Sequence, residues 1–346
     1  MNLQCPIPLS DYPVVTLAHG GGGSLMRRLI RDMFTCAFGC DNVQANMDSA
    51  ILELASQRIA FTTDSFVVRP LFFPGGDIGA LAINGTVNDL AMVGAEPRYL
   101  SCGMILEEGL SMQALWQIVT SMKHAADQAS VTIVTGDTKV VDKGKGDGIF
   151  INTAGIGVFE HTLVIGPKSI KPGDDILVSG DIGRHGMAIL CAREELALDV
   201  PIQSDCAPLN RIVRAMLVAG IELHALRDAT RGGLASALIE MTDDAGVTIS
   251  IREKDIPVRE EVRGACELLG IDPLYVANEG CFVMALPAEQ SDMALELLAK
   301  HGATGASPAK IGKVESNSGG RLILHSLIGA KRYLDLHHGE QLPRIC

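Results

Sequence analysis

Residues 112–139 read MQALWQIVTSMKHAADQASVTIVTGDTK, which joins a helix pattern to a strand pattern and then to two charged residues. The apolar spacing over 112–126 predicts a helix, and the β-branched run 131–135 predicts a strand. Asp137 and Lys139 follow two residues apart, so in extended backbone both side chains leave the same face. One can then bind a metal ion while the other holds a phosphate oxygen. A surface salt bridge is the alternative.

Outward from this stretch, the same mixture of short strands and helices continues. The 37 glycines, five of them followed by Asp, divide the chain into short segments, which predicts a mixed α/β (α+β) protein. A chain of 346 residues favours two domains, and 167–173, with two prolines and a glycine, is typical of a linker. We therefore expect the following organisation: a lead segment 1–43, an N-terminal domain 44–160, a C-terminal domain 168–328 and a flexible tail 329–346.

Composition and charge exclude several classes of protein. No run reaches ~18 apolar residues, and the N-terminus lacks both a basic start and an apolar core, so we expect a cytoplasmic protein without a membrane span. The net charge of −12 argues against nucleic-acid binding, which depends on clustered Lys and Arg. Nine cysteines without a Cys-x-x-Cys pair fit neither a disulfide framework nor a zinc site, and we expect most of them to be buried.

Carboxylates recur where predicted strands or turns lead into helices: Asp48, Asp64, Asp89, Asp137 and Asp228. Mg²⁺ binds oxygen ligands and bridges a few carboxylates to phosphates, so several of these residues can share one ion. Taken singly, an Asp at such a position is more often a helix cap or turn residue. Only their coincidence favours a metal site.

Two further segments suit phosphate. Gly20–Gly23 precedes Ser24 and a helical pattern, where backbone N–H groups and the helix dipole can converge on an anion, although a flexible linker is the alternative. It is not a Walker A loop, because the required Lys is missing. Arg231, in Asp228-Ala229-Thr230-Arg231-Gly232-Gly233, offers its guanidinium to phosphate at a helix start. A surface salt bridge remains its alternative.

Three residues are candidates for acid, base or carrier chemistry. Glu279 lies at a turn before an apolar strand, which suits a general base, and Gly280 allows close backbone approach. His185, between Arg184 and Gly186, can titrate near neutral pH, or it is a capping or core histidine. Cys346 ends the chain, and a tail from Ala330 can carry its thiol about 50 Å. The alternative is a frayed terminus with an accidental cysteine.

These motifs together resemble the HypE family of hydrogenase maturation factors over nearly the whole chain. The resemblance rests on the glycine run after His19 and on the following segments: 62–68, 73–79, 85–91, 136–141, 228–233 and the ending Pro343-Arg344-Ile345-Cys346. The nucleotide-site motifs alone resemble the wider superfamily of aminoimidazole ribonucleotide synthetase and selenophosphate synthetase. The cysteine ending is specific to the HypE family.

The resemblance implies a two-domain aminoimidazole ribonucleotide synthetase-like fold and a homodimer whose N-terminal sheets pair. It implies ATP and Mg²⁺ in a cleft near that pairing, covered by the glycine-rich segment. The implied metal ligands are Asp48, Asp64, Asp89 and Asp228. The implied nucleotide contacts are Gly21, Gly22, Gly23, Thr86, Asn88, Asp137, Lys139 and Arg231. One departure is that the family loop carries a serine among its glycines, whereas here Ser24 follows four glycines.

The resemblance also implies a reaction. A HypF-like carbamoyltransferase places a carbamoyl group on Cys346, ATP drives its dehydration to a thiocyanate, and the cyanide passes to iron on a HypC–HypD complex. Lys139 would neutralise phosphoryl charge, and Glu279 would accept a proton. Two alternatives remain. A selenophosphate synthetase needs a reactive cysteine near a lysine early in the chain, and no Lys precedes residue 123. A nucleotide-regulated adaptor would use the tail without chemistry.

Overall fold

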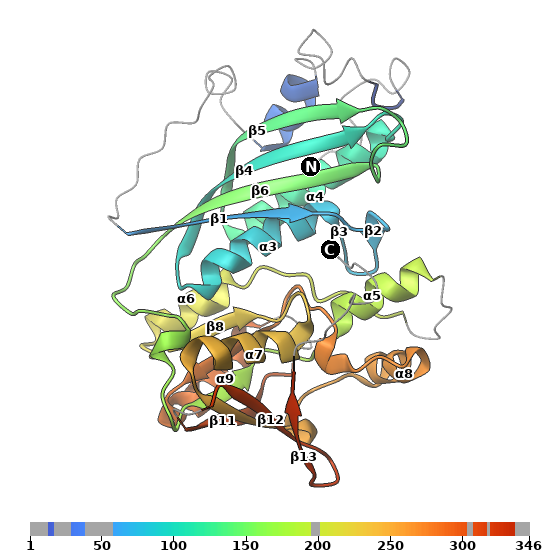
Figure 1. The fold of residues 1–346 in the computed structure, drawn as a ribbon. Helices are drawn as coiled ribbons and strands as arrows, with labels where there is room; N and C mark the ends of the chain where they lie inside the picture. Colours follow the sequence, from blue (N-terminus) through green and yellow to red (C-terminus); the bar gives the residue numbers. More distant parts are fainter. Residues whose placement is uncertain are drawn as a thin grey trace. The chain divides into compact units, whose positions relative to one another are not determined.

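The computed structural model describes residues 13–16, 29–38, 58–194, 201–302, 307–316 and 319–335. Contacts divide the chain into two compact units (Figure 1). Unit 1 comprises Met1–Phe72, Gly76–Leu90 and Pro97–Val158, and unit 2 comprises Phe73–Gly75, Ala91–Glu96 and Phe159–Cys346. Helices and sheets occur in both units, as the α+β prediction requires.

Unit 1 is built on a four-stranded sheet in the order β1-β6-β4-β5. Its elements, with the short β2–β3 pair, are η2 Ile30–Thr35, α2 Cys36–Phe38, β1 Ile59–Phe66, β2 Phe72–Phe73, β3 Gly76–Asp77, α3 Ile78–Met92, β4 Glu96–Glu107, α4 Met112–Ala129, β5 Thr132–Val141 and β6 Ile149–Val158. Helices α3 and α4 lie against one face of the sheet (Figure 1). Helix α4 begins at the cap Ser111, whose hydroxyl accepts the Ala114 N–H, and ends at Ser130 in left-handed backbone.

The two faces of the unit 1 sheet differ in character. On β1, Thr62 points toward α3, while Ile59 and Phe61, on the other face, are 50% and 69% exposed. On β4, Met104 is buried while Ile105 is 43% exposed. Because successive side chains of a strand point to opposite faces, one face packs under the helices and the other presents apolar side chains outward.

Unit 2 is built on a seven-stranded sheet in the order β13-β12-β9-β11-β7-β10-β8. Its strands are β7 Asp175–Val178, β8 Ala225–Asp228, β9 Thr248–Arg252, β10 Phe282–Leu286, β11 Ala309–Ser316, β12 Arg321–His325 and β13 Lys331–Leu334. Its helices are η4 Pro167–Ser169, α5 Arg184–Arg193, α6 Asn210–Val218, α7 Gly233–Ala245, η5 Glu253–Asp255, α8 Glu260–Leu269, η6 Pro273–Tyr275, η7 Ala288–Gln290 and α9 Ser291–His301.

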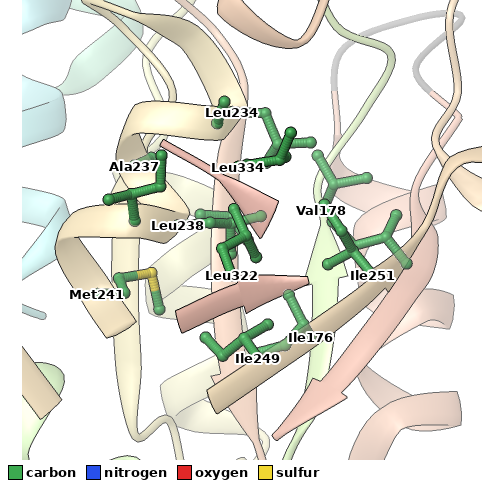
Figure 2. Close-up of a cluster of buried hydrophobic side chains, with 14 of the residues drawn as sticks. Ile176, Val178, Leu234, Ala237, Leu238, Met241, Ile249, Ile251, Leu322 and Leu334 are labelled. Carbon is green, nitrogen blue, oxygen red and sulfur yellow. The ribbon is translucent and has the colours of Figure 1, made fainter. Parts of the chain in front are cut away.

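Strands β7 and β10 of the unit 2 sheet are buried on both faces. On β7, Ile176 and Val178 join a core with Leu234 and Leu238 of α7, which Figure 2 shows. Leu177, between them in sequence, joins the opposite core with residues of α6 and α9. Strand β10 alternates in the same way, so its residues are apolar at every position. Burial on both faces stabilises β10, which pairs with β8. The candidate site lies at the ends of these two strands.

The observed elements agree with the predicted helices and strands, with two differences. Strand β5 continues to Val141, beyond the predicted end at Thr135. Residues 331–334, expected within the flexible tail, form β13, which pairs antiparallel with β12. Among the described residues, no helix is both long and apolar enough to cross a membrane.

Candidate functional site

In unit 1, strand β1 and helix α3 bring two of the predicted carboxylates to one seam. The Thr62 hydroxyl donates to Oδ2 of Asp89 at 3.0 Å. Asp64, two residues along β1, lies on the same side as Thr62, and a Cβ added to Gly85 of α3 would lie 3.9 Å from its Oδ2. The same Cβ would come within 2.8 Å of the Phe66 ring, so glycine permits this close approach.

Asp89 and Asp137 depart from the predicted placement at strand-to-helix transitions. Asp89 lies within α3, and Asp137 lies within β5. The prediction of a turn at Asp137 is wrong, because β5 continues to pair with β4 in parallel through this point, with Gly103 opposite Asp137. Asp64 lies inside β1, two residues before its end, whereas Asp228 does end β8 ahead of α7.

Thr86 and Asn88 are buried in α3, with 0% and 2% exposure. The Thr153 hydroxyl of β6 donates to the Ala82 carbonyl at 3.1 Å, so the Thr86 hydroxyl is the donor in its 2.5 Å contact with Thr153. The Thr86 side chain is therefore used in fixing α3 to β6. We infer that it supports the site from within the helix–sheet packing.

Asp137 and Lys139 leave β5 on one face, as their spacing predicts, with buried Thr138 between them. Lys139 Nζ lies 3.1 Å from Asp137 Oδ2, and both side chains are more than 60% exposed. An ion pair this exposed contributes little stability, so Lys139 can exchange its partner for a phosphate oxygen at small cost.

The two groups of unit 1 lie apart within one chain. Lys139 is opposite Ile105 in the β4–β5 register, on the outward face, whereas Asp64 and Asp89 lie on the helix-covered side. Strands β1 and β5 are also the two edges of the sheet, three strand spacings or about 14 Å apart. One unit 1 alone therefore does not unite these residues around a single ion.

In unit 2, Asp228 and Arg231 flank the start of α7. Asp228 is opposite Phe282 of β10, and Arg231 is exposed in the turn that follows. Gly233 has a φ of +63°, and a Cβ there would lie 2.6 Å from the carbonyl oxygens of Leu274 and Val276. Gly233 thus allows the first turn of α7 to pack against the backbone of residues 274–276. Asp228 and Arg231 lie just before the N–H groups of this turn.

The turn that carries Glu279 is joined to this same strand end. The Asn278 backbone and side-chain N–H groups both donate to the Ala229 carbonyl at 2.9 Å. Asn278 Oδ1 accepts the Gly183 N–H at 2.6 Å. Glu279 itself is 7% exposed. Asn278 precedes Glu279 and Ala229 follows Asp228. These hydrogen bonds therefore hold the predicted base close to the end of β8, where Asp228 lies.

His185 is a core histidine. It is fully buried, its Nδ1 lies 2.8 Å from Ser204 Oγ, and the Phe73 ring meets it edge-on. Burial lowers the pKa of His185 to about 3, so the imidazole is neutral at physiological pH. The prediction that His185 titrates near neutrality is wrong, and the alternative of a core histidine is confirmed.

Six cysteines fall within the described residues, and four of them are buried: Cys102, Cys191, Cys266 and Cys281. Gly21, Gly22, Gly23, Asp48 and Cys346 lie outside the described residues. Across the described part of the chain, no three His, Cys, Asp or Glu side chains form a metal-binding group. The Asp64–Asp89 seam nevertheless offers the hard oxygen donors that suit Mg²⁺.

Two features of this neighbourhood carry no clear sequence signal. Asp205, in the segment between α5 and α6, accepts hydrogen bonds from the Glu279 turn, and Arg184 lies 2.7 Å from Asp181. Both aspartates are buried. Their segments lack a periodic pattern or a turn signature tied to Glu279, and only the fold brings them together.

Comparison with known proteins identifies the family. The model described as "AIR synthase related protein, N-terminal domain" matches residues 46–159, and the corresponding C-terminal domain matches 171–325. A carbamoyl dehydratase HypE of Azotobacter vinelandii is 48% identical over 332 residues, covering 96% of this chain and 97% of that protein. The chain belongs to the HypE family.

Solved HypE structures agree with this membership. A crystal structure of the hydrogenase maturation protein HypE in complex with ATP has a TM-score of 0.91 and 46% identity, covering 95% of this chain and 99% of that one. A HypE–HypF complex has a TM-score of 0.78 and 46% identity, covering 89% of this chain and 99% of that one. HypE relatives of this chain are thus enzymes by name, and solved members bind ATP and HypF.

Proposed function

We propose that this chain is an ATP-dependent carbamoyl dehydratase that converts a carbamoyl group on the Cys346 thiol to a thiocyanate. The cyanide serves as an iron ligand in nickel–iron hydrogenase maturation. The observation that carries the proposal is the nearly buried Glu279, in a turn hydrogen bonded to the β8 end that bears Asp228. The family membership supplies the substrate class.

The reaction needs a leaving group and a base. The amide oxygen attacks the γ-phosphoryl group of ATP, ADP departs, and an imidate phosphate remains on the sulfur-bound carbon. One N–H proton is lost as the imidate forms, and loss of phosphate and of the remaining N–H proton then forms the nitrile. Glu279 accepts one proton, since a carboxylate in the turn beside the reacting group can act as a general base. Cys346 holds the reacting carbon, and its own tail supplies a high effective concentration.

The phosphate end of the site is assigned by residue type. Asp48, Asp64, Asp89 and Asp228 would hold Mg²⁺, whose charge favours phosphoryl transfer. Lys139 would neutralise a phosphate oxygen once it leaves Asp137, and Arg231 would offer a planar fork to another. Gly21, Gly22 and Gly23 would supply backbone N–H groups. Thr86 and Asn88 would contact the nucleotide, as the resemblance implies, and Thr86 also holds α3 to β6, which positions Asp89.

A homodimer follows from the separation of Lys139 and Asp64 within one chain. The outward sheet face of unit 1 presents Phe61 and Ile105, and a second copy covering this face would bury them. A partner's Lys139 would then reach this chain's carboxylates around the edge strand β1, which carries Asp64. A HypF-like carbamoyltransferase and a HypC–HypD complex are the proposed donor and acceptor, and the solved HypE–HypF complex supports the first.

The test follows the mass of the C-terminal peptide. The full chain is incubated with a HypF-like carbamoyltransferase, carbamoyl phosphate and ATP, and Cys346 is expected to gain a carbamoyl adduct that then loses one water. Glu279→Gln should accumulate the undehydrated adduct, and Cys346→Ala should acquire none while still binding ATP. An unmodified Cys346 in the wild-type chain would instead favour the adaptor.

A further inference from the structure

Asp205 lies directly behind the Glu279 turn. It belongs to the segment that joins α5 to α6, and its side chain is 4% exposed. Its Oδ1 accepts the Glu279 N–H at 3.1 Å, and its Oδ2 accepts the Gly280 N–H at 3.1 Å. One carboxylate thus holds the two consecutive peptide groups on either side of the Glu279 Cα atom.

The backbone of the same segment closes on the turn. The Ala207 N–H donates to the Glu279 carbonyl at 3.3 Å. A Cβ added to Gly280 would lie 1.8 Å from the Asp205 carbonyl oxygen, a contact that only glycine permits. The Glu279 Cα atom therefore cannot shift without breaking these hydrogen bonds or moving the Asp205 segment.

Charge around Asp205 is balanced by arginine. Arg184, 9% exposed, pairs with Asp181 at 2.7 Å, and Arg259 reaches the same Asp181 at 3.1 Å. Burial raises the pKa of Asp205, and the two N–H donors and the Arg184 charge act against that rise. A carboxylate this buried is costly unless its partners are in place, so the two peptide N–H groups and the arginine are needed together.

We propose that Asp205 is a positioning residue for dehydration: it fixes the Glu279 turn so that the Glu279 carboxylate stays in line with the proton it accepts. The inference rests on the proposed function of Glu279. Asp205 itself faces backbone amides and touches no reacting atom. Asp205 therefore affects the rate of dehydration only by positioning Glu279. If Asp205 only stabilised the fold, its substitution would change the rate in the same way whether or not Glu279 is present.

A double-mutant cycle tests this dependence. Asp205→Asn replaces one acceptor oxygen by an amide that cannot accept, so one N–H of the turn loses its partner. We expect the single-turnover rate of adduct dehydration to fall roughly 10- to 100-fold, with the affinity for ATP unchanged. Added to Glu279→Gln, the same substitution should slow the residual rate by less than about twofold, since residues acting as one unit are not additive.

The matched control is Asp175→Asn. Asp175 is a carboxylate of similar burial in the same unit, held by Ser291 Oγ and Lys310 Nζ at 2.6 Å each, and it lies opposite Leu286 at the far end of β10 from the Glu279 turn. This variant should lose stability but keep the wild-type rate. If Glu279→Gln is too slow to measure, Glu279→Asp takes its place in the cycle, because it retains a shortened carboxylate.

Each outcome has a defined meaning. Asp205→Asn with the wild-type rate, or with an equal slowing in both backgrounds, would overturn the positioning role. If Glu279→Gln dehydrates normally, the base assignment fails first, whatever Asp205 does. Should Asp205→Asn not fold, Asp205→Glu decides the question: it keeps both acceptor oxygens, and a rate that falls only when Glu279 is present supports the proposal.

Discussion

At the residue scale, His185 shows how burial sets a proton equilibrium. Its imidazole is enclosed beside Ser204 and Phe73, and burial lowers its pKa to about 3, well below the ordinary value of 6.5. The unfolded chain takes up a proton at this residue as the pH falls through 6.5, but the folded chain does not. The stabilising contribution of neutral His185 is therefore complete above pH 6.5 and declines between pH 6.5 and about 3.

This sign gives a measurable pH dependence. Each pH unit below 6.5 should remove about 1.4 kcal/mol of the free energy of unfolding through His185, or about 2 kcal/mol by pH 5. His185→Gln lacks this titration. The difference in unfolding free energy between wild type and variant, measured by urea denaturation, should narrow by that amount from pH 7 to pH 5. A constant difference would contradict the burial argument.

Residue type alone does not separate Glu279 from His185. Each is flanked by glycine and leads into another element, and both are candidates in the sequence. The difference lies in what packs against them: Glu279 is in a turn held by Asp205 and Ala207, whereas His185 is inside a core. Asp205 and Arg184 escape sequence reasoning because their roles depend on contacts between distant segments.

At the element scale, the start of α7 depends on glycine for space as well as for backbone conformation. Gly233 has a φ of +63° and backs onto two carbonyl oxygens at 2.6 Å from an added Cβ. Gly246, the C-cap of the same helix, has a φ of +68° but nothing within 4 Å of an added Cβ. Both glycines have left-handed backbone, which costs free energy for a residue with a Cβ. Only Gly233 also has neighbouring atoms that an added Cβ would meet.

A matched pair of substitutions separates these two costs. Gly246→Ala should lower the free energy of unfolding by about 1–2 kcal/mol, the cost of left-handed backbone for a residue with a Cβ. Gly233→Ala should cost at least about 2 kcal/mol more, because the carbonyls of Leu274 and Val276 must also move. Thermal unfolding of both variants measures the difference. Equal losses would show that the close approach at Gly233 carries no energy.

Most element types could be predicted from the sequence, and the exceptions have a physical cause. The helix predicted over 112–126 is found at Met112–Ala129, and the apolar strand predicted after the Glu279 turn is found at Phe282–Leu286. The β-branched run predicts a strand only over 131–135. Pairing with β4 carries the strand to Val141, so tertiary contact outweighs local preference there.

At the scale of the whole molecule, we propose that the catalytic centre draws on two subunits. Lys139 and Asp64 lie on opposite faces and at opposite edges of the unit 1 sheet. The sequence predicts both residues as ligands of one centre but does not reveal this separation, because strand order is set by long-range pairing. If a partner's Lys139 completes the site, damaged subunits can compensate for one another.

Mixed dimers test this directly. Lys139→Ala and Asp64→Asn homodimers should each lose most of their dehydration activity, but a mixture of the two proteins should recover part of it, since one of the two sites in a heterodimer is then intact. A mixture of Asp64→Asn with Asp89→Asn should recover none, because both substitutions affect the same half of the site. Recovery in neither mixture would argue for a site built within one chain.

Strand β13 has a further consequence for delivery. It pairs with β12, and the Tyr275 hydroxyl donates to the Asp335 carbonyl at 3.0 Å, so the chain is anchored at Asp335. From this anchor, residues 336–346 extend at most about 40 Å in any conformation. The terminal sulfur is thus confined to a sphere of known centre and radius. Every donor and acceptor must bring its own reacting atom inside that sphere, so chain length by itself limits where such proteins can bind.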